Sequence, residues 1–507
     1  MSGLSGKPVS YWIDSTPETD YPGLMGDIEV DVAVVGGGIV GITAALLLKR
    51  AGKKVALIEA DQIVQGTTGY TTAKLTSLHR LVYADLVQQL GEDKARLYGE
   101  SNQAAIAFVA DLVAQEQIDC DFSRQSAYTF ATTEKDLKQV RSEVEAAQKL
   151  GLPADFVTET SLPFPVLGAV RFADQAQFHV RKYLLHLAAQ IPGDGSHVFE
   201  QTRAVSLEGE NPCSVVTDRG TVRAQDVILA THLPFRDEGL YFAKSFPRRS
   251  YLVGAPIDPA IAPQGMFIGA GEDYHSIRTT PHEGGTLLIV GGEGHKTGEK
   301  EDTETCYRRL EDYMRQQFGV EPTYRWSTQD IVSFDKLPYI GRLTPLHQHV
   351  YVATGFSLWG MSKGTLSAMI LSDLILGRPN PWASLYDSLR ATPFVSKKSI
   401  QENIDVAAHW IGDRFKGLTD HSLQDLQPGE GRLVTIDGDR IAASRDEQGN
   451  LHTVSPICPH LACLVSWNNA EQSWDCPCHG SRFSCDGKIL EGPAVEGLAP
   501  KSVEVKA

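Results

Sequence analysis

Hydrophobic residues near the start of the chain fall into short runs whose spacing predicts a strand, a helix and a second strand. Residues 31–35 form an apolar, valine-rich run suited to a buried parallel strand. Residues 42–50 follow with helical spacing and stop before Gly52, a residue suited to end a helix. A second apolar run covers 54–59 and ends in an acid. The pattern predicts a βαβ unit with parallel strands.

The middle of the chain mixes helical and strand periods. An amphipathic helical stretch covers 83–116, and strand-like runs cover 227–232, 285–292 and 350–356, the last followed by a helix over 365–376. We therefore expect one α/β unit over 1–395, in which about 78–165 and 235–332 form an α+β substrate domain.

The last part of the chain has a different pattern. Short apolar runs at 432–436 and 440–444 flank Asp437-Gly438, a strong hairpin signal, and a further turn leads to a strand over 451–454. These features predict an all-β domain over 425–507. Residues 396–424 before it are charged and helix-prone, and we expect a linker helix there.

Length and composition narrow the class of protein. A chain of 507 residues is too long for one core and suggests two or three domains. A net charge of −16 argues against nucleic acid or an anionic membrane as the main partner. No signal peptide is visible, and glycines interrupt the longest apolar run, 32–48, so we expect no transmembrane segment. Five of the eight cysteines lie in 458–485, which favours a local cofactor site in a cytoplasmic protein.

The turn between the first strand and helix carries a dinucleotide-binding fingerprint. Gly36 permits the tight turn, Gly38 lets the backbone approach a pyrophosphate, and Gly41 lets the helix pack on the strand. Glu59, at the end of the second strand, is placed to accept hydrogen bonds from ribose hydroxyls. The fingerprint alone fits FAD or NAD, but no second one occurs in the sequence, so a separate NAD(P)H domain is not expected.

Three further segments resemble the D-amino-acid-oxidase-like (glycine/sarcosine-oxidase-like) FAD-dependent oxidoreductases. They are a Gly/Thr-rich loop after Glu59, the segment 178–232, and the strand–turn–helix segment 335–376. The resemblance implies a two-dinucleotide-fold FAD domain with non-covalent FAD, because Tyr70 stands where some relatives carry the His that attaches the flavin. The further cofactor-binding residues that it implies are Thr67, Thr68, Thr72, Val205, Thr231, Gly341, Gly355, Trp359, Gly360 and Met361.

The same resemblance implies a substrate pocket and the role of one helix. The N-terminus of the helix over 365–376 would stabilise negative charge on the reduced flavin. The turn before it departs from the Gly-Gly-His-Gly-like version of many amine oxidases, which weakens the expectation of reaction with oxygen. Tyr251, Tyr274 and Arg278 are the candidate catalytic residues of the pocket, where Arg278 would hold a carboxylate by a bidentate pair.

Cysteine and histidine alternate in two short segments of the C-terminal domain. Cys458 and His460 lie in the first, and Cys476 and His479 in the second. Two thiolates and two imidazoles also make a zinc site, but Cys-x-His is an unusual zinc spacing. The segments resemble the ligand loops of Rieske [2Fe–2S] proteins, in which cysteines hold one iron and histidines the other.

The Rieske resemblance extends beyond the four ligands. Cys463 and Cys478 match the pair that forms a disulfide in cytochrome-bc-type members, and 491–494 matches the proline loop that shields the cluster. Phe483 stands where high-potential members often have a Tyr, which implies a lower potential. In relatives the two histidines lie at the solvent edge, so His460 and His479 would form the exit side.

The combined pattern predicts an FAD-dependent oxidoreductase acting on a CH–NH or CH–NH₂ bond. A small amine or amino acid would reduce the flavin, and the cluster would pass electrons singly to an external acceptor, a protein or a quinone. In one alternative a partner protein loads the cluster and the flavin reduces or oxygenates a metabolite. In another the protein is a redox sensor.

Overall fold

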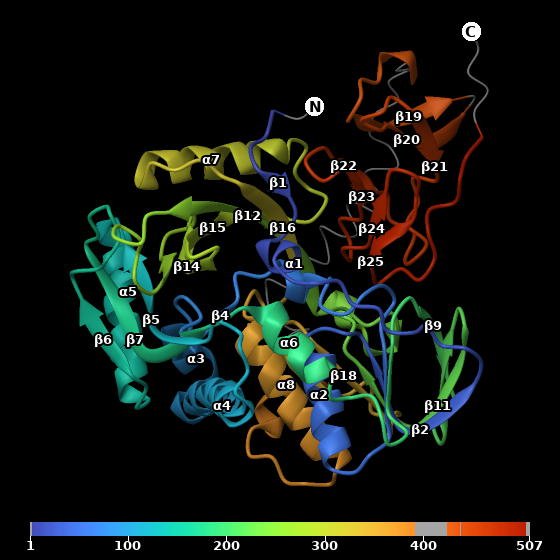
Figure 1. Cartoon of the computed structure of the whole chain (residues 1–507), viewed down its shortest axis with the longest axis horizontal. Coiled ribbons are helices and arrows are strands. Elements are labelled where there is room, and N and C mark those ends of the chain that lie inside the picture. The colour runs from blue at the N-terminus through green and yellow to red at the C-terminus, as the bar shows by residue number, and fades with distance from the viewer. Residues whose placement is uncertain (1–2, 391–422, 437, 503–507) are drawn as a thin grey trace.

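The computed structural model describes residues 3–390, 423–436 and 438–502. Two larger sheets build the N-terminal part of the molecule, and two small sheets build the C-terminal part (Figure 1). The linker helix expected over 396–424 lies outside the described residues, except for a short turn at Leu423–Asp425.

The first large sheet contains the predicted βαβ unit. Its order is β17-β18-β11-β2-β3-β8, with β9 and β10 attached to β11, and its central strands from β18 to β8 are parallel. The helices α2, α6 and α8 pack together beside it (Figure 1). The bounds are β2 Ile28–Val35, β3 Val55–Ile58, β8 His197–Phe199, β9 Ala204–Glu208, β10 Cys213–Thr217, β11 Gly220–Leu229, β17 Tyr339–Arg342, β18 Val350–Thr354, α2 Ile39–Arg50, α6 Val180–Ala188 and α8 Gly360–Ile375.

The second large sheet belongs to the expected substrate region. Its order is β1-β16-β12-β15-β14-β13-β5-β7-β4, with β6 paired to β7. Helix α7 packs on β12 and β15, and α5 on β5, β6 and β7. The bounds are β1 Lys7–Pro8, β4 Lys74–Leu75, β5 Ser123–Ala131, β6 Ala154–Val157, β7 Gly168–Gln177, β12 Ser245–Ile257, β13 Met266–Gly269, β14 Ser276–His282, β15 Gly285–Lys296, β16 Tyr324–Ser333, α1 Tyr11–Asp14, α3 Tyr83–Leu90, α4 Glu92–Glu116, α5 Glu134–Lys149 and α7 Glu304–Phe318.

The C-terminal domain consists of two antiparallel sheets, as its short apolar runs predicted. One has the order β19-β20-β21, and the other β22-β23-β24-β25, which lies beside β16 in Figure 1. A compact core that includes Trp474, Phe483 and four cysteines fills the second part. The bounds are β19 Gly431–Ile436, β20 Asp439–Arg445, β21 Leu451–Val454, β22 Ser466–Asn468, β23 Ser473–Asp475, β24 Arg482–Ser484 and β25 Ile489–Glu491.

Two expected helices have different bounds in the structure. The amphipathic stretch 83–116 is two helices, because Gly91 takes a φ of +83°, which no helix accommodates. The helix expected from residue 365 already begins at Gly360 and so brings its N-terminus closer to the preceding turn. No helix in the described part of the chain is both long and apolar enough to cross a membrane.

Candidate redox site

The glycine turn between β2 and α2 leaves no room for side chains at two positions. Gly36 has a φ of +111°, and a Cβ there would lie 2.5 Å from the carbonyl oxygen of Ala230. A Cβ on Gly41 would lie 1.8 Å from the carbonyl oxygen of Gly36. The turn therefore depends on glycine for its shape, and it presents the N-terminus of α2 to the space beyond it, as phosphate binding requires.

Glu59 and Thr68 flank this turn. The Glu59 carboxylate accepts hydrogen bonds from the amides of Gly37 at 2.7 Å and Asp61 at 3.1 Å. Burial raises the pKa of Glu59, and these amides partly offset the effect. The Thr68 hydroxyl accepts a hydrogen bond from the amide of Ile39 at 3.2 Å. The second strand thus delivers its terminal acid to the turn, where the fingerprint requires it.

A cavity of about 1180 Å³ opens in front of the turn. A single small-molecule pocket usually measures about 300–1,000 Å³, so this one has room for a cofactor and a substrate together. Its size, glycine turn and acid fit FAD. The predicted cofactor residues that line it are Gly36, Gly38, Glu59, Thr67, Thr68, Thr72, Thr231, Trp359, Gly360 and Met361.

Four other predicted cofactor residues do not line the cavity. Gly41 lets the helix pack on the strand, the role that the fingerprint gave it, and next to Val205 the wall is formed by Arg203 and Ala204. Gly341 has a φ of +144° and packs against Ser388, while Gly355, with a φ of +78°, packs against Tyr339. Both glycines shape turns, because no other residue takes these conformations easily.

The N-terminus of α8 forms another part of the cavity wall. Ser357 and Leu358 adopt left-handed conformations, with φ of 54° and 72°, and turn the chain sharply into the helix. The Asp330 carboxylate accepts a hydrogen bond from the Leu358 amide and braces this turn. Gly360 and Met361 line the cavity, so the positive end of the helix dipole faces it.

The three candidate pocket residues have different positions. Tyr251 and Tyr274 line the cavity, although the Tyr251 hydroxyl is already within hydrogen-bond distance of His295, at 3.0 Å. Arg278 does not line it. Its guanidinium is buried and donates to the carbonyls of Thr72, at 2.9 Å, and Ala73, at 2.8 Å. The prediction that Arg278 holds a substrate carboxylate is therefore wrong, because backbone carbonyls occupy its donors.

Arg248 is one of three arginines that line the cavity, with Arg80 and Arg203, and the sequence singled out none of them as a pocket residue. It lies on β12, where Phe246, Arg248 and Ser250 alternate toward the cavity. Its Nη2 donates to the Gly294 carbonyl at 2.8 Å, whereas its buried Nε has no hydrogen-bond partner among the described residues. The sequence shows a period-two pattern from Phe246 to Ser250, but it does not show which face of the strand lines the cavity.

Basic side chains that are buried in the cavity wall tend toward their neutral forms. Burial lowers the pKa of Lys363 to about 7, and it lowers the pKa of Lys74 and of His79 well below their usual values. The ammonium of Lys74 donates to the Ser276 hydroxyl at 2.6 Å, and that of Lys363 to the Lys336 carbonyl at 2.9 Å. The wall therefore repels a cationic ligand less than its composition implies.

The C-terminal domain brings the four candidate iron ligands together. The thiols of Cys458 and Cys476 are buried, and a hydrogen bond between them lowers the pKa of Cys458 to about 7. The rings of His460 and His479 are 5.0 Å apart between centroids, with their planes at 83°. Two adjacent thiols and two adjacent imidazoles are the donor set of a Rieske cluster, and the site fits it.

A disulfide and the proline loop enclose these ligands. Cys463 and Cys478 form a disulfide, with Cα atoms 6.5 Å apart, and its sulfurs lie within 4.8 Å of the Cys476 sulfur. The Ser481 hydroxyl accepts a hydrogen bond from the Ala494 amide at 3.0 Å, which ties the proline loop to the second ligand segment. The loops are thus covalently and non-covalently fastened around the site.

The two candidate histidine ligands lie in different surroundings. His479 is buried, and its ring meets Phe242 of the N-terminal part edge to face, with centroids 5.1 Å apart. His460 is partly exposed. The expectation that both histidines lie at the solvent edge is therefore wrong for His479, because the N-terminal part of the molecule covers it.

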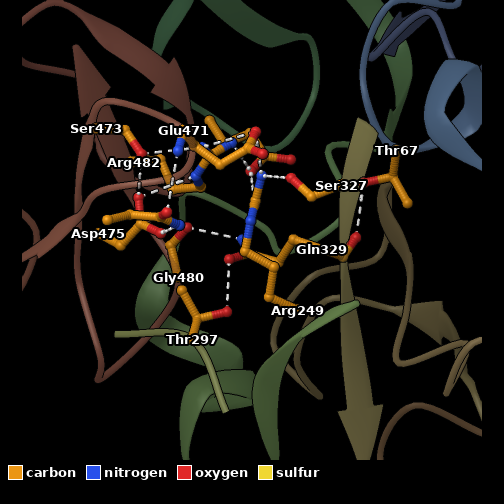
Figure 2. A network of polar contacts seen from close by, with 12 residues as sticks. Thr67, Arg249, Thr297, Ser327, Gln329, Glu471, Ser473, Asp475, Gly480 and Arg482 are labelled. Atoms are coloured by element: carbon orange, nitrogen blue, oxygen red, sulfur yellow. Dashed lines mark hydrogen bonds and ion pairs between the residues drawn. The ribbon is translucent and has the colours of Figure 1, made fainter. Parts of the chain in front are cut away.

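Polar contacts join the two parts of the molecule next to His479 (Figure 2). The Gln329 side chain on β16 donates to the Gly480 carbonyl at 2.7 Å and accepts from the Thr297 hydroxyl at 2.8 Å. The backbone carbonyl of Gln329 accepts from the Thr67 hydroxyl at 3.0 Å, and Thr67 lines the cavity. A short series of bonded groups thus connects the cavity wall to the ligand segment.

A buried cluster of charges holds the same interface (Figure 2). Arg249 lies 3.3 Å from Glu471 and 3.6 Å from Glu491, and only 2% of its side chain is exposed. Arg482 adds contacts to Asp475 at 3.0 Å and Glu491 at 3.1 Å. Such a cluster defines one relative position of the domains, because each buried charge needs its partners.

Comparisons with known proteins agree with this geometry. The FAD dependent oxidoreductase family model matches residues 31–374, and the Rieske [2Fe-2S] domain model matches residues 419–502. The chain is 40% identical over 497 residues to the Rieske 2Fe-2S iron-sulfur protein YhfW of Bacillus subtilis (strain 168), covering 97% of each chain.

Two other matches cover the N-terminal part. Gamma-glutamylputrescine oxidoreductase of Escherichia coli (strain K12) is 24% identical over 367 residues, which cover 69% of this chain and 84% of that protein. The crystal structure of glycine oxidase from Geobacillus kaustophilus aligns with a TM-score of 0.61 at 19% identity, covering 71% of this chain and 99% of that one. The second match shows the fold alone.

Proposed function

Because the chain belongs to the FAD dependent oxidoreductase family and carries a Rieske [2Fe-2S] domain, we propose that it oxidises a small amine or amino acid and delivers the electrons singly to an external acceptor. When bound, FAD takes a hydride from the substrate carbon, and the iron–sulfur cluster carries one electron at a time. The residues of the chain hold the cofactors, orient the substrate and connect the two sites.

The cavity supports an amine or amino-acid substrate. Arg248 offers a guanidinium edge to a carboxylate, and the aromatic ring of Tyr274, which Arg80 covers at 4.0 Å, provides an apolar wall. Lys74 and Lys363 tend toward neutrality and so do not strongly repel a substrate amine. The names of the related E. coli oxidoreductase and of the structurally similar glycine oxidase point to the same class of compound.

The position of His479 is the observation that carries the electron-transfer proposal. This ring packs on Phe242 of the flavoprotein part, whereas His460 is partly exposed. The hydrogen bonds of Gln329 connect the cavity wall at Thr67 to Gly480, next to His479. Electrons would therefore enter on the His479 side and leave to a protein or quinone on the His460 side.

Anaerobic rapid mixing of the holoprotein with a panel of amines and amino acids tests this function. We expect one of them to bleach the flavin absorbance first and to bring up the reduced-cluster EPR signal afterwards. If the cluster is reduced while the flavin stays oxidised, the proposed order is wrong. If no amine or amino acid reacts but a reduced ferredoxin loads first the cluster and then the flavin, electrons flow inward instead.

A further inference from the structure

Residues 490–495, which end β25 and continue into the loop after it, belong to the C-terminal domain, yet they form part of the flavin cavity; we call them the loop 490–495. Leu490, Glu491 and the segment 492–495 line the same cavity as Gly36 and Thr67. Pro493 and Ala494 are buried. One cavity wall therefore comes from a domain whose own cofactor is the cluster.

Charges anchor this loop at Glu491, the last residue of β25. Glu491 lies 3.1 Å from Arg482 of its own domain and 3.6 Å from Arg249 of the flavoprotein part. Arg249 is almost fully buried and also contacts Glu471, at 3.3 Å. Withdrawing the loop would leave buried arginine charge without its full set of partners, which is unfavourable. The loop is thus held against the cavity by a specific contact.

Two observations place the C-terminal domain near the helical turn Thr67–Tyr70 as well. Tyr70 closes the short helical turn Thr67–Tyr70, and burial together with the charges of Glu471 and Glu491 raises its pKa. The Thr67 hydroxyl bonds to Gln329, whose side chain bonds to Gly480. The C-terminal domain therefore lies near this turn and is connected to it through Gln329, which bonds to both Thr67 and Gly480.

We propose that the loop 490–495 is a component of the FAD site: it covers the bound cofactor, and FAD leaves only after the loop has moved away. Its buried Pro493 and Ala494 exclude water from the cavity at that wall. The Ala494 amide also bonds to Ser481 beside the cluster ligands, so one loop serves both cofactors. Loop closure and FAD binding are then coupled, and each stabilises the other. This inference rests on FAD binding in the cavity and not on the substrate or the direction of electron flow.

Hydrogen exchange measured by mass spectrometry on the full-length protein tests the coupling directly. The cluster is left in place, and exchange is compared with FAD bound and with FAD removed. We expect FAD to slow exchange in a peptide over 490–495 and to leave the distant strand β21, Leu451–Val454, unchanged. Equal exchange of 490–495 in the two states overturns the proposal.

A substitution at the anchor gives a second, independent measurement. Glu491→Gln keeps the size of the side chain and removes its charge, so we expect FAD to dissociate severalfold faster, followed as the rise of free-flavin fluorescence. Glu430→Gln is the matched control, because Glu430 pairs with Arg432 at 2.9 Å at an exposed position of the same domain. We expect it to release FAD at the wild-type rate, and both variants to keep the EPR signal of the cluster.

Wild-type FAD release from Glu491→Gln overturns the proposal. If this variant does not fold, the exchange experiment on the unaltered chain decides. A failure of amine oxidation would leave FAD retention and loop protection as measured, so the two proposals fail separately.

Discussion

Arg248 and Arg249 are neighbours on one strand, but they serve two different regions. Arg248 faces the flavin cavity, where its Nε has no partner in the described part of the chain. Arg249 points to the opposite face of β12, where Glu471 and Glu491 surround it. In the cavity wall, burial lowers the pKa of the lysines, so less positive charge is present there. At the domain interface, the charged side chains lie beside partners of opposite charge. Arg249 also leaves its Nε and Nη1 without a hydrogen bond in the described part of the chain, so what distinguishes it from Arg248 is the pair of carboxylates within 3.6 Å that compensates its buried charge.

The largest expected effect comes from removing the paired arginine. Arg249→Leu leaves Glu471 and Glu491 partly unpaired in a buried interface, and we expect the free energy of unfolding to fall by about 3–5 kcal/mol. Denaturant titration followed by circular dichroism measures it. Arg248→Leu on the same strand should change stability by less than about 1 kcal/mol. Equal losses of unfolding free energy in the two variants would contradict the difference between the two faces of β12.

Gln329→Leu tests the hydrogen bonds that join the two domains next to the cluster ligands. The Gly480 carbonyl and the Thr297 hydroxyl each lose a buried partner, which should cost about 1–3 kcal/mol of unfolding free energy. We also expect electron transfer from photoreduced flavin to the cluster to slow severalfold, followed by flash absorption spectroscopy.

The control for Gln329 is Gln175→Leu. Gln175 is equally buried and bonds to Ser77 at 2.8 Å and to Ala173 at 2.9 Å within the flavoprotein part. It should lose similar stability while the transfer rate stays unchanged. Unaltered transfer in Gln329→Leu would show that this side chain only supports the fold.

The pH dependence of stability tests whether burial in the cavity wall lowers the pKa of Lys363. Burial places the pKa of Lys363 at about 7, below the ordinary value of 10.5. Between these values the unfolded chain binds more protons, so Lys363 makes stability rise by about 1.4 kcal/mol per pH unit. Below about pH 7 both states are protonated, and its contribution stays at its minimum.

Lys363→Met should lower the slope of this rise by about 1.4 kcal/mol per pH unit, leaving the part that the buried Lys74 contributes, measured by denaturant titrations from neutral to alkaline pH. Lys336→Met is the control, because Lys336 is exposed and pairs with Asp85 at the surface. The alkaline rise should persist in that variant. A Lys363→Met protein with the wild-type slope would mean that this lysine stays charged when buried.

The smallest expected effect concerns the cluster itself. Phe483 is fully buried among the ligand segments and carries no donor. Phe483→Tyr adds a hydroxyl that can donate to a cysteine sulfur and stabilise the reduced cluster. One hydrogen bond of about 0.5–1.5 kcal/mol corresponds to a potential raised by about 20–65 mV. Protein-film voltammetry measures the shift, and an unchanged potential would mean that the hydroxyl does not reach the sulfur.

Local sequence was sufficient for the parts of the site that lie within one short segment. The strand, glycine turn, helix and terminal Glu59 follow one another within the βαβ unit, and both ligand pairs lie on short loops. The positive φ at Gly36 needs only a glycine in the turn, and the continuous apolar run of β2 is visible in the sequence. The two fold classes, and the antiparallel pairing of β19 with β20, were readable for the same reason.

Contacts between residues that lie far apart in the chain could be known only from the tertiary structure. The family resemblance placed Arg278 in the pocket, but packing turned it toward the carbonyls of Thr72 and Ala73, whereas Arg248 of β12 lines the cavity. Nothing local to His479 indicates that Phe242 covers it, or that the loop 490–495 reaches the cavity of another domain. These contacts join residues far apart in the chain, and their energy arises only when the two domains bury the same charges together.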